Sequence, residues 1–143
     1  MTAADIDAVC VKSTEYKVFD LADTLLSGKG PRALQMLDGL LREGNDRLMM
    51  LSLLGRQCRQ LYYIAVMTEA GKKQNEMAAE LGLNSYILPK LLPLARRYTS
   101  GQLKKAARLC TETEYLVKSG QMMDAGALEK VMLEIMSLGK EHT

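Results

Sequence analysis

The residue types that most often perform catalysis are scarce in this sequence. The chain of 143 residues contains one histidine, His142, which stands next to the C-terminus. Chain ends are usually poorly ordered, so a general base or metal ligand at that position would be poorly placed. The three cysteines, Cys10, Cys58 and Cys110, lie far apart and form no Cys-x-x-Cys pair. They predict neither a zinc site nor a disulfide framework, and we interpret them as small buried side chains in a reducing compartment.

Two further patterns look like parts of a catalytic site without completing one. Residues 27–31 read Ser-Gly-Lys-Gly-Pro, but a phosphate-binding loop needs Gly, four residues and then Gly-Lys-Ser/Thr after a strand. Pro31 also removes one backbone N–H that such a loop would use. Asp20 and Asp23 can share one face of a helix, yet no histidine or glycine-rich loop accompanies them. The sequence therefore predicts no enzyme, no metal site and no cofactor site.

A possible helix-turn-helix lies in the middle of the chain. Residues 76–84 read Glu-Met-Ala-Ala-Glu-Leu-Gly-Leu-Asn, which suits a tight turn between two packed helices. A reader of DNA needs polar side chains at the start of its second helix, to reach the base edges. Here that helix begins Ser-Tyr-Ile-Leu-Pro-Lys-Leu-Leu, which is mostly apolar. A nucleic-acid-binding domain of this type is therefore the alternative function, ranked second.

The charges are distributed unevenly along the chain. The formal net charge is +2, but residues 56–109 carry ten basic and three acidic side chains. Segments of mildly negative charge flank this basic segment. Such a segment can be an ordinary solvated face, or it can contact an acidic partner surface or a nucleic-acid backbone.

The elements that would position these residues are all helices. Apolar residues recur at intervals of three and four, and β-branched residues are sparse. We expect an all-α fold, a compact bundle of about six or seven helices. Asp46 is predicted to cap the longest helix and Thr99, with Gln102, to cap another, whereas Pro93 is expected to kink or interrupt its helix. The expected helices cover approximately residues 3–11, 16–26, 31–42, 47–70, 74–81, 85–98, 99–117 and 125–138.

Length and composition fit one domain that buries its own core. Hydrophobic residues make up 48% of the chain, which is too many for a disordered chain of such low net charge. No stretch approaches the roughly 18 consecutive apolar residues of a membrane span. The acidic first residues, Met-Thr-Ala-Ala-Asp-Ile-Asp, do not form a signal peptide.

Six short motifs follow one another along the chain, at residues 18–23, 33–38, 54–61, 79–83, 90–99 and 116–120. Their order resembles a known family, the C-terminal domain of the delta subunit of bacterial DNA polymerase III. Each motif alone is weakly specific, but their order and spacing together are more specific, and the resemblance extends from about Tyr16 to Leu138. Pro93 departs from the family pattern, because the corresponding helix is usually uninterrupted.

The resemblance implies a helical collar, or oligomerisation, domain of the clamp loader. Residues 1–14 would be a lead-in segment from a missing upstream domain, with a possible short helix, and residues 15–143 would form the collar domain. Its partners would be the other clamp-loader subunits, whereas the sliding clamp and DNA would be contacted only by regions outside this chain. The resemblance also implies a cytoplasmic bacterial protein that needs no cofactor, does not bind a membrane and acts on no small-molecule substrate.

Four arginines are the candidate contacts with such partners. Arg56, Arg59, Arg96 and Arg97 all lie in the basic segment. Arginine is favoured at subunit interfaces because its planar guanidinium forms forked hydrogen bonds and is weakly hydrated. The choice of these four rests on their chemistry and their position in the chain.

Overall fold

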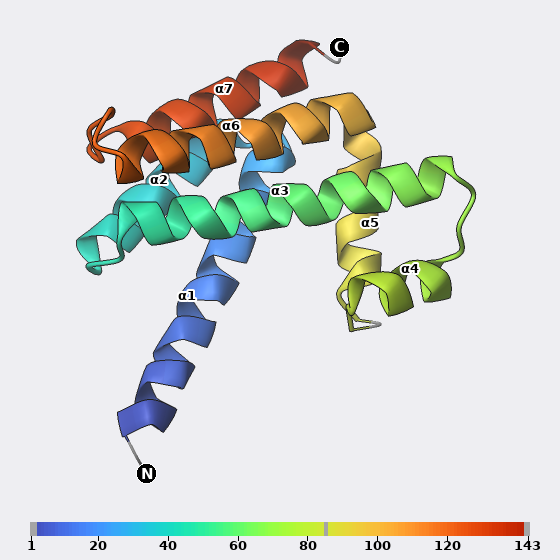
Figure 1. Ribbon diagram of the computed structural model, residues 1–143, viewed down its shortest axis with the longest axis horizontal. Helices are drawn as coiled ribbons and strands as arrows, with labels where there is room; N and C mark the ends of the chain where they lie inside the picture. Colours follow the sequence, from blue (N-terminus) through green and yellow to red (C-terminus); the bar gives the residue numbers. More distant parts are fainter. Residues whose placement is uncertain (1–2, 85, 142–143) are drawn as a thin grey trace.

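Helices account for all the regular secondary structure in the part of the chain that the structure describes. The computed structural model describes the backbone of residues 3–84 and 86–141 and the side chains of residues 15–84 and 86–138. The all-α prediction is confirmed for these residues (Figure 1). The helices are α1 (Ala3–Leu26), α2 (Gly30–Arg42), α3 (Arg47–Glu69), α4 (Gln74–Leu81), α5 (Leu88–Arg97), α6 (Ser100–Lys118) and α7 (Ala127–Glu141).

Helix α3 is the centre of the bundle. Its apolar residues surround most of its girth, and the long helix packs along α6 while it also contacts α1, α4, α5 and α7 (Figure 1). Gly55 lets α3 and α6 approach closely, because a Cβ at this position would lie 3.0 Å from the Cβ of Cys110. A larger residue at position 55 would therefore push the two central helices apart.

Local sequence signals set most of the helix ends as expected. The side chain of Asp46 accepts a hydrogen bond from the backbone N–H of Met49 at 2.9 Å. Thr99 and Gln102 form the predicted capping box at the start of α6. Gly82 ends α4 in the left-handed conformation, with φ of 65°, which residues other than glycine adopt at a cost.

Three expectations about helix ends differ from the structure. The break predicted between residues 11 and 16 is wrong, because α1 is continuous and no glycine or proline interrupts it there. Helix α5 begins at Leu88, three residues later than expected, and continues through Pro93. Helix α7 begins at Ala127 because Gly126, with φ of 83°, lies outside the right-handed helical region.

The tolerance of Pro93 follows from its place in α5. A proline lacks the N–H that would bond to the carbonyl four residues earlier, which here belongs to Pro89. Both prolines are exposed, so water can hydrate the carbonyl that Pro93 leaves unbonded. Interruption of the helix at Pro93, one of the two outcomes expected, does not occur.

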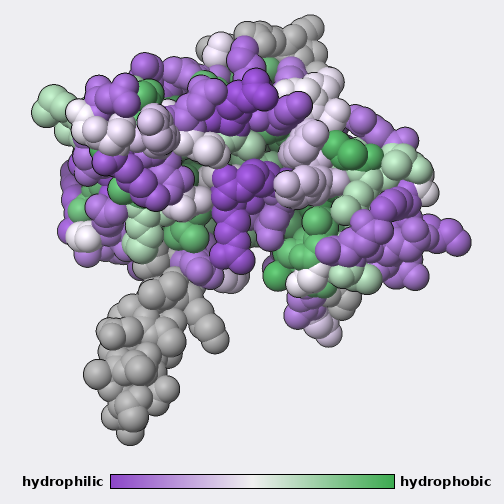
Figure 2. All heavy atoms as spheres, viewed as in Figure 1, coloured by the Kyte–Doolittle hydropathy of each residue, from purple (hydrophilic) through white to green (hydrophobic). Residues whose placement is uncertain are grey.

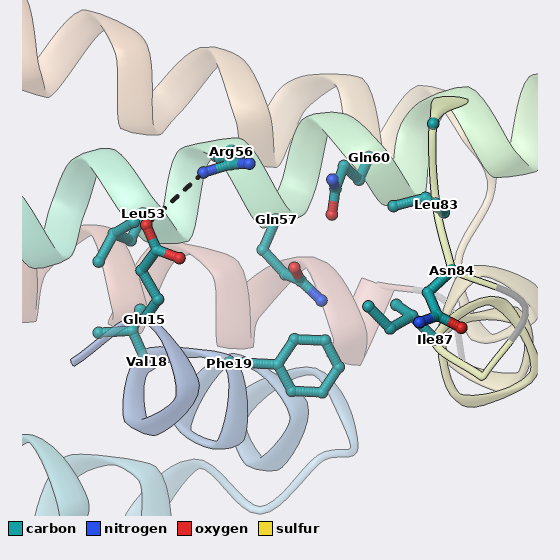
Figure 3. A pocket seen from close by; sticks show the side chains of 11 residues that line it. Glu15, Val18, Phe19, Leu53, Arg56, Gln57, Gln60, Leu83, Asn84 and Ile87 are labelled. Atoms are coloured by element: carbon teal, nitrogen blue, oxygen red, sulfur yellow. Dashed lines mark ion pairs between the residues drawn. The ribbon is translucent and has the colours of Figure 1, made fainter. Parts of the chain in front are cut away.

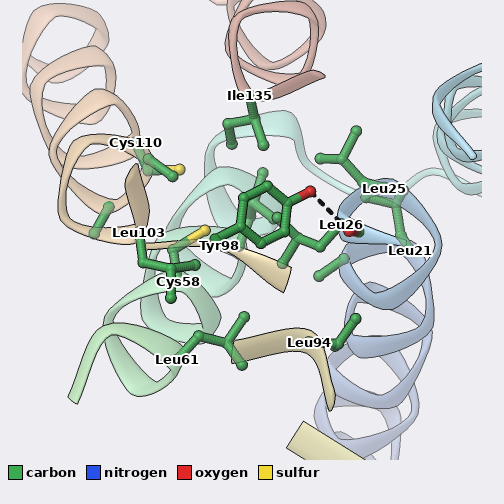
Figure 4. Packing of buried hydrophobic residues seen from close by; sticks show 14 of the residues in the cluster. Leu21, Leu25, Leu26, Cys58, Leu61, Leu94, Tyr98, Leu103, Cys110 and Ile135 are labelled. Atoms are coloured by element: carbon green, nitrogen blue, oxygen red, sulfur yellow. Dashed lines mark hydrogen bonds between the residues drawn. The ribbon is translucent and has the colours of Figure 1, made fainter. Parts of the chain in front are cut away.

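Tyr98 joins the C-terminal end of α5 to the C-terminal end of α1 within the core. The hydroxyl of Tyr98 donates a hydrogen bond of 2.7 Å to the carbonyl of Leu26, the last residue of α1 (Figure 4). Burial raises the pKa of Tyr98, and the nearby charge of Arg97 offsets part of this rise. Cys58 and Cys110 lie beside it as free, fully buried cysteines, as predicted; the side chain of Cys10 lies outside the described residues.

Candidate partner-binding surface

The four candidate arginines do not gather into one patch. Arg56 on α3 points toward α1, where its guanidinium lies 3.9 Å from the carboxylate of Glu15. Arg59, one turn further along α3, instead donates a hydrogen bond of 3.2 Å to the hydroxyl of Thr111 on α6. Arg56 and Arg59 therefore both have contacts with side chains of the same chain.

Arg96 and Arg97 lie at the C-terminal end of α5, where a positive charge is favourable to the helix dipole. Both are exposed, and Arg96 forms no ion pair with any residue whose side chain is described. The guanidinium of Arg97 lies over Gly28, at 2.8 Å from where a Cβ would stand. Of the four arginines, Arg96 is thus the one most available to another molecule.

A groove lies between α1, α3 and the turn that joins α4 to α5 (Figure 3). Its volume is about 380 Å³, and Phe19, Leu53, Leu83 and Ile87 give it apolar walls. Phe19 comes from α1, Leu53 from α3, and the other two from the connection between α4 and α5. Three segments that are far apart in the sequence therefore enclose it.

Gln57 projects from α3 into this groove, between Phe19 and Ile87 (Figure 3). Its side chain is only 7% exposed, and its Nε2 has no hydrogen-bond partner in the described structure. A buried donor without an acceptor costs about 1–3 kcal/mol. Gln57 is the polar group in this groove that most needs a partner.

The groove continues into a second hollow with an acidic rim. This hollow, of about 610 Å³, shares Glu15, Phe19 and Ile87 with the first. Asp20 and Asp23 on α1 line it together with Lys90 on α5. Three carboxylates thus face a single lysine around this opening, which makes the rim negative although the chain as a whole is slightly positive.

Hydrophobic surface gathers near this region of the molecule. Figure 2 shows apolar atoms collected below α3, between the α1 and α4 sides of a face that is otherwise mostly hydrophilic. Ile87 is 38% exposed, and Tyr86 beside it is 79% exposed. Large exposed apolar side chains that border a hollow are typical of contact surfaces.

The start of α5 is not arranged to read DNA. Leu88, Leu91 and Leu92 are buried in the core, while Ile87 and Lys90 face the hollow beside α1. The carboxylates of Asp20 and Asp23 across that hollow would repel a phosphate backbone. The helix-turn-helix alternative is therefore not favoured by this geometry.

Sequence reasoning missed Gln57 as a candidate, although a signal was present. Gln57 stands three residues after Leu54 and four before Leu61, both of which are fully buried. This spacing places it on the inward face of α3. Because Gln57 stands in a polar stretch beside Arg56, the inward direction of its side chain could not be recognised from polarity alone.

The described residues show neither a metal-binding cluster nor a membrane-spanning helix. Among the side chains that the structure describes, no three His, Cys, Asp or Glu residues come close enough together to hold a metal ion. None of the helices in the described ranges combines the length and apolar character needed to cross a bilayer.

Comparison with known proteins places these helices in a family. The family model for "DNA polymerase III delta subunit, C-terminal domain" matches residues 15–135. The DNA polymerase III subunit delta of Bacillus subtilis is 20% identical over 142 residues, which cover 99% of this chain and 41% of that protein. The solved structure of the Bacillus subtilis DNA clamp loader delta protein superimposes with a TM-score of 0.80 at 20% identity, covering 96% of this chain and 40% of that one.

Proposed function

Because this chain belongs to the family formed by the C-terminal domains of DNA polymerase III delta subunits, we propose that it is the subunit-association (collar) domain of a bacterial clamp loader. In this role it helps to hold together the complex that loads the sliding clamp onto DNA during replication. It acts in the bacterial cytoplasm, performs no chemistry of its own and needs no cofactor. Contacts with the clamp and with DNA belong to other parts of a longer protein.

The extent of the family match is the observation that carries this proposal. The match begins in the middle of α1 and ends within α7, so it includes every helix in between. It therefore concerns the whole bundle and not one shared motif. The chain spans 41% of the length of the Bacillus subtilis relative, which fits the role of one domain within a larger protein.

The described surface is also suited to contact with other proteins. Several large apolar or aromatic side chains stand more than half exposed, namely Tyr16, Tyr86, Tyr115, Met123 and Leu133. Tyrosine and methionine are enriched at protein interfaces, and burying such side chains contributes most of the free energy of association. In this proposal Arg96 and Arg97 are the arginine contacts most available to a neighbour. Arg56 and Arg59 contribute to the contact surface while they keep their contacts with Glu15 and Thr111.

Co-purification tests the proposed function. The full-length protein that contains this chain is expressed with the other clamp-loader subunits of the same organism and separated by size-exclusion chromatography. We expect one complex, and we expect it to be lost when residues 15–143 are deleted. A full-length protein that is folded by circular dichroism yet elutes apart from the other subunits would contradict the proposal.

A further inference from the structure

We propose that the groove between α1, α3 and the α4–α5 turn binds a segment of a neighbouring clamp-loader protein that presents an apolar side chain next to a lysine or arginine. This inference rests on the proposed function, because it names the chemistry of one partner contact. Of the four candidate arginines, Arg56 alone lines this groove, where its guanidinium faces Glu15.

The apolar half of the groove calls for an apolar side chain. Phe19 is the only phenylalanine in the sequence, and it is partly exposed in the groove instead of being buried in the core. Leu53, Leu83 and Ile87 complete the walls around a volume of about 380 Å³. Such a space accommodates one large aliphatic or aromatic side chain, whose burial would remove these walls from water.

Gln57 adds a polar requirement to the same space. Its Nε2 is buried, lacks an acceptor, and is carried by a side chain that extends toward the ring of Phe19 (Figure 3). An entering peptide offers carbonyl oxygens at regular intervals along its backbone. One such oxygen accepting from Gln57 would satisfy the donor and fix the register of the segment.

The charges around the adjoining hollow determine which residue the partner segment should carry next to its apolar side chain. The carboxylates of Asp20 and Asp23 form no ion pair with any side chain that the structure describes, and Glu15 has Arg56 only at 3.9 Å. Lys90 alone opposes them within the hollow. A cationic side chain on the partner would complement this rim, whereas an acidic peptide or a phosphate backbone would be repelled.

Two groove variants and one control test the proposal in the full-length protein. Asp20→Lys/Asp23→Lys reverses the rim, and Gln57→Met replaces the orphaned amide with an apolar side chain of similar length. Glu112→Lys is the control, because Glu112 is exposed on α6 and forms no ion pair with a described residue. Affinity for the purified partner subunits is measured at low and at high salt, together with the thermal midpoint of each variant.

We expect reversal of the rim to weaken binding by about tenfold at low salt, and by less at high salt, because the attraction is screened. Gln57→Met should weaken binding several-fold while its thermal midpoint stays equal or rises. A residue with only a structural role could not show that combination, since its loss would lower the midpoint. Glu112→Lys should bind like the wild type.

The outcomes separate this proposal from the proposed function. If the wild type binds its partners and both groove variants bind equally well, the groove proposal is wrong and the proposed function stands. If the wild type itself does not bind, both fail. Self-association of the wild type that disappears in the same variants would assign the groove to a second copy of the chain and would also overturn the proposal.

Discussion

Tyr98 connects two helices that are distant in the sequence. Its ring lies among buried leucines, and its hydroxyl reaches the carbonyl of Leu26 at 2.7 Å. This carbonyl is one of the last in α1, where no following turn of helix is available to bond it. One side chain therefore both fills the core and completes a helix end.

Tyr98→Phe should destabilise the chain by about 1–2 kcal/mol, because it leaves the Leu26 carbonyl without its buried donor. The ring itself is retained, so the effect measures the hydroxyl. Urea denaturation followed by circular dichroism gives the free energy of unfolding. Tyr115→Phe is the matched control, since Tyr115 is 65% exposed, and it should change the free energy of unfolding by less than about 0.5 kcal/mol. Equal effects in the two variants would contradict the prediction.

The helices show which sequence signals determine structure locally. Asp46, Thr99 and Gly82 could be identified from the sequence because each acts on neighbouring backbone groups within a few residues. The break expected in α1 was wrong, since Ser13 and Thr14 have only weakly unfavourable helix propensities and do not end a helix by themselves.

Loss of the capping box should weaken α6 measurably. Thr99→Ala removes the hydroxyl that accepts from the backbone N–H of Gln102 at 3.1 Å, and we expect a loss of about 1 kcal/mol in the free energy of unfolding. Thr99→Ser keeps the acceptor and should retain most of the stability. Ser100→Ala serves as the control, because the hydroxyl of Ser100 bonds to no described residue. A Thr99→Ala variant as stable as Thr99→Ser would show that the cap is unimportant.

At the scale of the whole molecule, three of the ten basic side chains of residues 56–109 interact with other side chains of the same chain. Lys72 pairs with Glu80, Arg56 with Glu15 on α1, and Arg59 bonds to Thr111 on α6, so these three charges are directed to different elements. The division into residues 1–14 and 15–143 stays a prediction.

The fold class could be predicted from the periodicity of apolar residues. The groove could not be predicted, since it depends on how α1 lies against the α4–α5 turn.

Arg96 provides a test of the assembly at this scale. If the proposed function holds, Arg96→Glu in the full-length protein should weaken association with the other clamp-loader subunits by about tenfold, because an exposed cation of the proposed contact set is replaced by an anion. Lys130→Glu, an equal change of charge at an exposed site on α7, should leave association unchanged. Analytical ultracentrifugation of the mixed subunits measures both. Unchanged association of Arg96→Glu would remove this arginine from the set of proposed contacts.

The two neighbouring thiols between α3 and α6, Cys58 and Cys110, can be used to measure how often the bundle opens. A hydrogen bond with Cys58 and burial raise the pKa of the Cys110 thiol, so this thiol stays protonated and unreactive while the helices are packed. An alkylating reagent can reach Cys58 and Cys110 only when α3 and α6 separate. In a Cys10→Ser background, the rate of labelling would report how often the bundle opens, and how far the proposed assembly with other subunits slows that opening.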